Sequence, residues 1–217
     1  RAAVARADVP AAAFRFMDAR TIDVGPYQAL VQRVSYTGDL GYEIYVNADE
    51  QYGLYQVLAQ AGAAHGMRPF GMRAMMSLRL EKFFGSWMRE FRPDYMPAET
   101  GMDRFVSYNK PAAFIGKAAA AAEKSAGPTR ALCAFAVDAD DADVVADEPI
   151  FDGEAVVGFV TSGGYAHYSE QSVALGFVPT EMAVDGQTFA IEILGDRRTA
   201  TIITTPLVDP DGARMRG

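Results

Sequence analysis

The chain has 217 residues and a formal net charge of −8, with half of its residues hydrophobic and 22% charged. This balance is typical of a globular protein with a real core, and the length favours two modest domains. Net negative charge without a Lys/Arg stripe argues against a nucleic-acid partner. No apolar run approaches the roughly 20 residues of a membrane span, and no signal-peptide pattern is present, so we expect no membrane partner and a cytoplasmic or organelle-matrix protein.

The N-terminal third predicts a β-hairpin that follows a short strand. Residues 1–13 are alanine-rich and lack an initiating methionine, so we expect the sequence to start partway through its first domain. Thr21–Val24 reads as a strand closed by a turn. Residues 29–36 and the strand Tyr42–Val46 then flank the two-glycine loop Thr37–Gly41. Together these segments predict a hairpin.

Two helices are expected next. Asp49 is a suitable N-cap for an amphipathic helix that ends near Gly66. A second helix is expected from Met72 to about Phe83, and its mostly apolar circumference predicts that it is buried. Its charged residues then need partners, and an internal ion-pair and hydrogen-bond network is the interpretation we favour for Arg79 and Glu81.

The remaining elements predict a change of architecture near residue 128. Residues 85–97 form an irregular aromatic and proline-rich segment suited to wall a pocket, and an alanine-rich helix within residues 114–124 stops at Gly127 and Pro128. Short β-type runs at regular spacing follow, which predicts a small antiparallel barrel or sandwich. The expected organisation is a first domain over residues 1–112, a linker helix over 113–128 and a β-domain over 129–217.

Several motifs are assigned structural rather than chemical roles. Two histidines and one cysteine are too few for a usual zinc site, so no metal is expected. Cys133 reads as an inert thiol inside a strand. Ser162–Gly164 lacks the helix and lysine of a phosphate loop and is interpreted as a hairpin turn. The acidic run Asp138–Asp143 lacks the glycine and glutamate of a calcium loop and is expected to be a surface loop.

The segment Ser35–Val46 carries the one strong signature. It resembles the SYTGELGYE-type motif of the glycine-cleavage T-protein (aminomethyltransferase) family. Further stretches resemble that family's motifs in the same order, including those at Ser77–Lys82, Pro97–Met102 and Phe114–Lys117, and later ones resemble its barrel domain. The last residues, 209–216, look most similar to the folate domains of sarcosine and dimethylglycine dehydrogenases. The resemblance covers nearly the whole chain.

The resemblance implies an α+β fold, with an N-terminally truncated folate-binding α/β domain followed by a small antiparallel β-barrel. It implies a tetrahydrofolate-binding part of a larger oxidoreductase, in which a flavin (FAD) in a separate domain or subunit oxidises an N-methyl amine such as sarcosine or dimethylglycine. Tetrahydrofolate then captures the one-carbon unit as 5,10-methylenetetrahydrofolate. An aminomethyltransferase of glycine cleavage, a folate-dependent demethylase and a non-catalytic folate-binding protein stay open as alternatives.

The candidate folate contacts are Tyr36, Glu43, Arg73 and Trp87. A pterin presents an adjacent ring N–H and amine, a donor pair that one carboxylate accepts with both oxygens, and Glu43 is our candidate for that role. Tyr36 is expected to lie beside the ring. From the residues alone, a packing tyrosine and a surface glutamate are the alternative interpretation.

One departure from the family lies on the second helix. Met75 stands where aminomethyltransferases carry a folate-contacting arginine. Arg73, a candidate on the same helix, lies about 200° around the axis from that position and cannot simply replace it. The family's acidic residue near the reacting nitrogen is expected before Arg1, so no catalytic residue is assigned.

Overall fold

The computed structural model describes Val9 and residues 13–217, and these divide into two compact units. Unit 1 comprises residues 1–78 and 208–217, and unit 2 comprises residues 79–207. Apart from Val9 and Ala13, the alanine-rich start of the sequence lies outside the described residues. The chain therefore leaves unit 1, builds unit 2 and returns to unit 1. The division at residues 112 and 128 stays a prediction.

Unit 1 is built on a three-stranded antiparallel sheet with the order β1-β2-β3. Its strands are β1 (Ala19–Val24), β2 (Tyr27–Gln32) and β3 (Glu43–Tyr45). Alternate residues face a small core, as the two-residue period of a strand requires. This core contains Phe14, Val24, Ala29, Val31 and Leu54, and Leu54 comes from α1 (Gln51–Ala63). The predicted hairpin is confirmed, because β2 and β3 pair antiparallel.

The predicted cap of α1 is wrong. Glu50, not Asp49, holds the N-cap position, and no side chain caps the helix. Glu50 instead accepts hydrogen bonds from the backbone and side-chain nitrogens of Asn47, at 3.4 and 3.1 Å. The turn before the helix is thus stabilised by a carboxylate that lies one residue later than the sequence pattern suggested.

The second helix, α2 (Met72–Glu81), is less buried than its apolar circumference predicts. Met72 is 68% exposed, and burial is confined to the last turn, Arg79–Glu81. That turn belongs to unit 2, where Leu80 packs against Ala134 and Leu175 of the barrel. The prediction of a mostly buried helix is therefore wrong for the first two turns.

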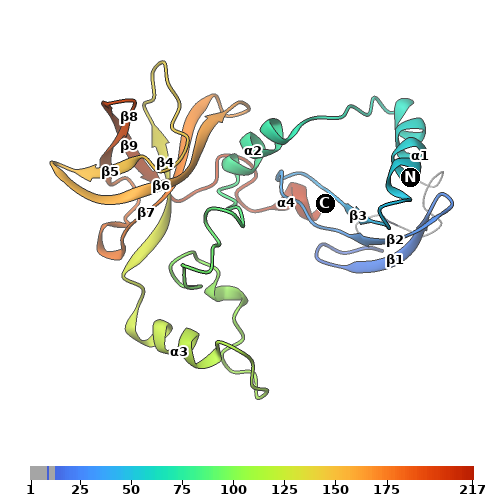
Figure 1. Ribbon diagram of the computed structural model, residues 1–217, viewed down its shortest axis with the longest axis horizontal. Coiled ribbons are helices and arrows are strands. Elements are labelled where there is room, and N and C mark those ends of the chain that lie inside the picture. The colour runs from blue at the N-terminus through green and yellow to red at the C-terminus, as the bar shows by residue number, and fades with distance from the viewer. Residues whose placement is uncertain (1–8, 10–12) are drawn as a thin grey trace. The chain divides into compact units, whose positions relative to one another are not determined.

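Unit 2 contains a closed six-stranded antiparallel barrel with the order β4-β7-β6-β5-β8-β9 (Figure 1). The α+β fold with a small antiparallel β-barrel is thereby confirmed, and the alanine-rich helix is present as α3 (Lys117–Ala126). The barrel core is apolar and includes Phe135, Ile150, Val160 and Ile191. The strands are β4 (Arg130–Val137), β5 (Pro149–Asp152), β6 (Ala155–Ala166), β7 (Gln171–Pro179), β8 (Thr188–Ile193) and β9 (Asp196–Ile203).

The predicted hairpin turn at Ser162–Gly164 is wrong. These residues lie inside β6 and pair with Val173–Leu175 of β7. Gly163 serves close packing, since a β-carbon there would lie 2.7 Å from the carbonyl oxygen of Val144. Gly163 thus marks a crowded position inside a strand rather than a chain reversal.

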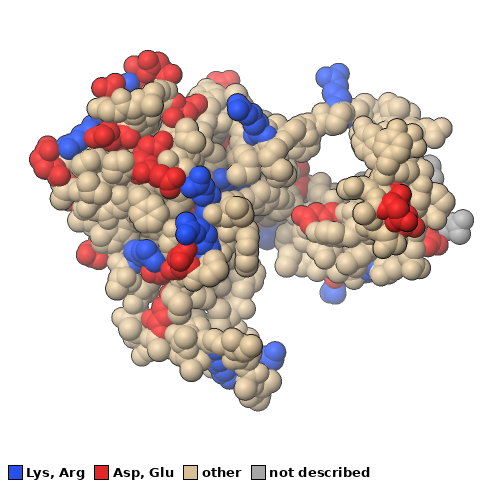
Figure 2. Space-filling model, viewed as in Figure 1, with Lys and Arg blue, Asp and Glu red and all other residues tan. Residues whose placement is uncertain are grey.

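Charged side chains of both signs intermingle on the barrel face shown in Figure 2. The barrel also carries exposed ion pairs, such as Arg197 with Glu154 at 3.0 Å and Arg198 with Asp140 at 3.3 Å. Asp140 and Asp141 of the acidic run both pair with Arg198.

Within the described residues, no helix has the length and apolar character that crossing a membrane requires.

Candidate functional site

The candidate site is centred on the β2–β3 hairpin of unit 1. Gln32 pairs with Glu43 and Leu30 with Tyr45, so residues 33–42 form the connection between the strands. Tyr36 and Glu43 are therefore carried by one hairpin, as predicted, with Tyr36 in the connection and Glu43 at the start of β3. Tyr36 is partly buried and Glu43 is exposed.

Glycines let the backbone of this connection fold tightly. A β-carbon on Gly41 would lie 2.7 Å from the carbonyl oxygen of Val34, so any side chain there would push the two limbs apart. Gly38 has a φ of 89° and donates its N–H to Ser35 Oγ at 3.1 Å. The glycines of the motif are thus explained by the close approach and the positive φ that the connection requires.

Strand alternation separates the residues around Glu43 into two sets. Tyr42 and Ile44 pack on the core of unit 1, and the Tyr42 ring lies 5.9 Å from that of Phe14. The Tyr42 hydroxyl donates to the carbonyl of Val9. Glu43 and Tyr45 point to the opposite, exposed face. The aromatic residue of the motif next to Glu43 is thus structural, and the carboxylate is available to a ligand.

Glu43 has a polar neighbour that the sequence reasoning missed. The hydroxyl of Tyr45 donates a hydrogen bond to Glu43 Oε2, and this bond raises the pKa of Tyr45. Each carboxylate oxygen has two lone pairs, so this contact leaves acceptor capacity on both oxygens. Residues two apart on a strand share a face, which is the signal that would have found Tyr45.

Arg73 and Trp87 lie away from the hairpin in the chain. Arg73 is exposed at the second position of α2 and belongs to unit 1. Trp87 belongs to unit 2 and is 74% exposed. The structure thus brings Tyr36 and Glu43 onto one hairpin and presents Trp87 from a separate unit. Roles of all four residues in ligand binding stay predictions.

A buried carboxylate holds the segment that carries Trp87. Glu90 is fully buried and accepts the N–H of Ser86 at 2.6 Å, the hydroxyl of Ser162 and an ion pair from Arg79 at 3.5 Å. Because Ser162 belongs to the barrel, this network fixes the ends of the 86–90 segment and leaves Trp87 exposed between them. Sequence reasoning predicted a network around Arg79 but not its partners.

The rest of the predicted network is also structural. Glu81 is 2% exposed and accepts the backbone N–H groups of Tyr168 and Ser169, at 2.8 and 3.3 Å. Glu81 thereby supplies hydrogen-bond acceptors to two backbone N–H groups in the turn between β6 and β7. The expectation that Arg79 and Glu81 pair elsewhere in an internal network is confirmed.

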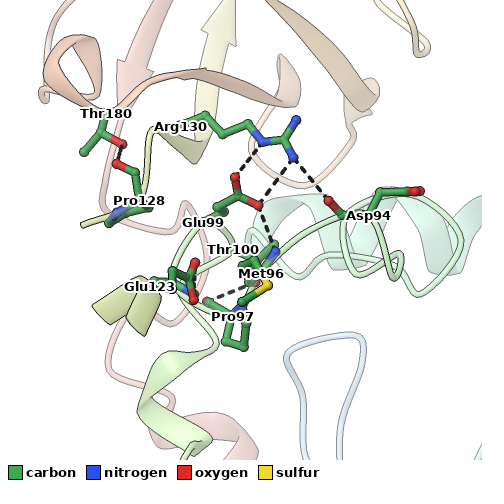
Figure 3. Close-up of polar contacts among 10 residues, drawn as sticks. Asp94, Met96, Pro97, Glu99, Thr100, Glu123, Pro128, Arg130 and Thr180 are labelled. Carbon is green, nitrogen blue, oxygen red and sulfur yellow. Dashed lines mark hydrogen bonds and ion pairs between the residues drawn. The ribbon is translucent and has the colours of Figure 1, made fainter. Parts of the chain in front are cut away.

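The Pro97–Met102 motif also builds structure rather than a ligand site (Figure 3). Glu99 pairs with Arg130 Nε at 2.8 Å and accepts the N–H of Met96, also at 2.8 Å. The Arg130 guanidinium lies over the rings of Tyr95 and Phe177. These contacts tie the motif to the start of β4 and to β7. Glu99 therefore has a structural role within unit 2, where it links the motif to the barrel.

Cys133 is a free, partly buried thiol on β4 of the barrel. Burial raises the pKa of Cys133 to about 11, as expected for a thiol in the barrel wall. Among the described residues no group of three or more His, Cys, Asp and Glu side chains is arranged to hold a metal ion.

Comparison with known proteins matches both parts of the chain to one family. Residues 1–110 match the GCVT N-terminal domain, and residues 130–209 match the glycine cleavage T-protein C-terminal barrel domain. A solved structure, the glycine cleavage system aminomethyltransferase T of Bartonella henselae, superposes with a TM-score of 0.82 at 25% identity, covering 93% of this chain and 55% of that one.

Curated relatives include enzymes of two types. Mouse mitochondrial dimethylglycine dehydrogenase is 39% identical over 94% of this chain and 24% of its own length. An aminomethyltransferase of Geobacillus thermodenitrificans is 32% identical over 89% of this chain and 52% of its own length. The chain thus spans about a quarter of the first relative and about half of the second. With its fold, its hairpin signature and both family models in agreement, the chain belongs to the glycine-cleavage T-protein (aminomethyltransferase) family.

Proposed function

We propose that this chain is the tetrahydrofolate-binding part of an enzyme that moves a one-carbon unit from an N-methyl amine of the sarcosine or dimethylglycine type. The product would be 5,10-methylenetetrahydrofolate. Identity to dimethylglycine dehydrogenase, 39%, exceeds that to the aminomethyltransferase, 32%, and supports the amine-oxidising branch. Met75, at the position of the family's folate-contacting arginine, supports the same branch.

The observation that carries the proposal is the exposed carboxylate of Glu43 on a glycine-tightened hairpin. The donor set of a pterin fits it, because the two carboxylate oxygens can accept the adjacent ring N–H and amine. Tyr36, in the same connection, would place its ring beside the pterin. These two residues would bind and orient the cofactor, and the folate nitrogens supply the chemistry of carbon capture when bound.

Arg73 and Trp87 take secondary roles in the proposal. Trp87 offers an exposed aromatic face on a segment anchored by the buried Glu90, which suits stacking on a planar ligand. Arg73 is an exposed cation on α2 for the anionic end of a folate. Its contribution is expected to be the smallest of the four, because the helix turns it away from the position that Met75 occupies.

The oxidation step is assigned to a flavin in another domain or subunit, which would act together with this chain and a small amine substrate. The chain itself would bind and position the folate, which makes a reaction between two separate reactants effectively unimolecular. We assign no catalytic acid or base among its residues. An aminomethyltransferase of glycine cleavage is the main alternative, supported by the TM-score of 0.82 to such an enzyme. A folate-dependent demethylase and a non-catalytic folate-binding protein are the others.

The test is calorimetric titration of the chain with tetrahydrofolate. We expect Glu43→Gln to bind about 10- to 100-fold more weakly, as for the loss of a charge-assisted hydrogen-bond pair. Asp49→Asn is the matched control, since Asp49 is another exposed carboxylate of unit 1 that lies outside the hairpin. Equal binding by wild type and Glu43→Gln would refute the pterin–carboxylate contact.

Product analysis of the full-length protein separates the alternatives. Methylenetetrahydrofolate formed from an N-methyl amine supports the proposal, and methyltetrahydrofolate would indicate a demethylase. Product formed only with an aminomethylated lipoyl protein would indicate the glycine-cleavage reaction. Folate binding without turnover of any donor would identify a binding protein.

A further inference from the structure

The residues that follow the barrel return to unit 1 and contact the hairpin connection that carries Tyr36. We call residues 208–217 the tail segment. They belong to unit 1, although the stretch from Arg79 to Leu207 that precedes them in the sequence forms unit 2. Within the tail segment, Arg214 places Nη2 2.7 Å from Asp39 Oδ1. Asp39 lies between Gly38 and Gly41. A distant part of the sequence is thus bonded to the middle of the glycine connection.

The tail segment is folded rather than loosely attached. Asp209 accepts the backbone N–H groups of Arg214, through its side chain at 3.1 Å, and of Gly212, through its carbonyl at 2.8 Å. Gly212 adopts a φ of 66° ahead of the short helix α4 (Ala213–Arg216). This turn fixes the backbone that carries Arg214, which lowers the entropy cost of its ion pair.

A buried arginine joins the tail segment to the start of the hairpin connection. Arg33 follows the last residue of β2 and is 1% exposed. Its guanidinium donates to the carbonyl of Phe14 at 2.7 Å and to the carbonyl of Arg216. Hydrogen bonds from a charged donor in a buried position are stronger than exposed ones, so Arg33 is the anchor of the tail segment.

We infer that the tail segment is a strap that positions the glycine connection for ligand binding, with Arg214 and Asp39 as its positioning residues. Arg33 holds one end of the strap where β2 ends and the connection begins, and Arg214 holds Asp39 in the middle of the connection. The ligand assignment rests on the proposed function. Arg214 acts through Asp39 and the backbone between Gly38 and Gly41, so it is not itself a folate contact.

The strap can be tested without a ligand by hydrogen exchange, read by NMR, of the Gly38 amide in the full 217-residue chain. Three variants are compared with wild type: Arg214→Gln, Asp39→Asn, and the exchanged pair Asp39→Arg with Arg214→Asp. Arg15→Gln is the control, because it removes the side chain of an exposed ion pair of unit 1, Arg15 to Asp18 at 3.6 Å, that is separate from the Arg214–Asp39 pair.

We expect each single variant to exchange Gly38 faster and to bind tetrahydrofolate about threefold more weakly, in line with an exposed ion pair. The exchanged pair should restore both values, and Arg15→Gln should change neither. Added salt should bring wild type toward the single variants.

Unchanged Gly38 exchange in both single variants would overturn the strap. Faster exchange with unchanged folate affinity would overturn its positioning role. If wild type does not bind tetrahydrofolate, the proposed function fails, and the exchange data alone decide whether the tail segment orders the connection.

Discussion

The hairpin of unit 1 and the Trp87 segment of unit 2 both present a candidate ligand contact, but different interactions hold them. The Trp87 segment is fixed by Glu90, which is fully buried among Ser86, Arg79 and Ser162. The hairpin relies on a glycine close approach and on an ion pair whose side chains are about half exposed. Removing one partner of a buried carboxylate lowers the free energy of unfolding strongly, whereas removing one partner of an exposed ion pair lowers it only slightly. The two segments should therefore differ in how strongly mutation of these contacts affects them.

The largest effect is expected at Glu90. Glu90→Ala should lower the free energy of unfolding by about 3–5 kcal/mol, because it leaves the Arg79 charge without its buried carboxylate and orphans the Ser86 N–H. Denaturant unfolding followed by circular dichroism measures it. Glu90→Gln, which keeps an oxygen acceptor, should cost less than half as much. A loss below about 1 kcal/mol, the value for an exposed ion pair, would remove the contrast between the segments.

A glycine pair in unit 1 tests the close approach. Gly41→Ala should cost about 1–3 kcal/mol, because its β-carbon would lie 2.7 Å from the Val34 carbonyl oxygen and the backbone must move. Gly71→Ala is the matched control, since a β-carbon at Gly71 meets no atom within 4 Å. Thermal unfolding of both variants gives the comparison. Equal stabilities would mean that the hairpin tolerates a side chain at Gly41.

Cys133 extends the comparison to the barrel wall of unit 2. With its pKa raised from 9.0 to about 11 by burial, its thiolate is scarce at pH 8, and labelling by a disulfide reagent should be roughly a hundredfold slower than for a thiol that keeps the value of 9.0. The rate should become ordinary once the chain is unfolded in urea. Fast labelling of the folded chain would show that the wall is open at this position.

The raised pKa of Cys133 also makes the stability of the protein depend on pH. Because the folded pKa lies above the unfolded value of 9.0, the contribution of the neutral thiol is complete below pH 9 and is lost as the pH rises from about 9 to about 11. Wild type should therefore lose stability faster than Cys133→Ala over that window, measured by denaturant unfolding. Parallel curves for the two proteins would contradict the raised value.

The smallest effect is expected at Tyr45. Its pKa is raised by the hydrogen bond that it donates to the exposed Glu43, so Glu43→Gln should return it toward the ordinary value near 10. Tyr108 of unit 2 is the control, because burial is the main cause of its raised pKa and the substitution should not move it. An NMR titration of the tyrosine rings reads both. If the pKa values of Tyr45 and Tyr108 both changed, the hydrogen bond to Glu43 would not be the cause of the raised pKa of Tyr45.

The sequence predicted the parts of the fold that depend on local pattern. Short β-type runs separated by glycine-containing loops predicted the hairpin and most barrel strands, and the alanine run predicted α3. Ser162–Gly164 was misread because glycine is typical both of turns and of crowded strands, and only the neighbouring Val144 distinguishes them. The extent of α2 burial depends on tertiary neighbours that its own sequence does not contain.

The candidate site was predicted in part for a related reason. Glu43 and Tyr36 belong to one contiguous motif, so a family resemblance was enough to select them. Arg33, Asp39 and Arg214 act together across more than 170 residues of sequence, and Glu90 and Ser162 are 72 apart. Pairings over such distances arise from tertiary folding and leave no spacing signal in a single sequence.

The return of residues 208–217 to unit 1 has a consequence for the order in which the protein forms on the ribosome. These residues are synthesised after the whole barrel. The hairpin therefore emerges early, but its contacts with residues 208–217 can form only after residues 79–207 have been made. Domains usually fold as units during synthesis. Here the barrel can complete its core while unit 1 still lacks its closing segment, so we expect unit 1 to reach its final protease resistance only after residue 216 has left the exit tunnel.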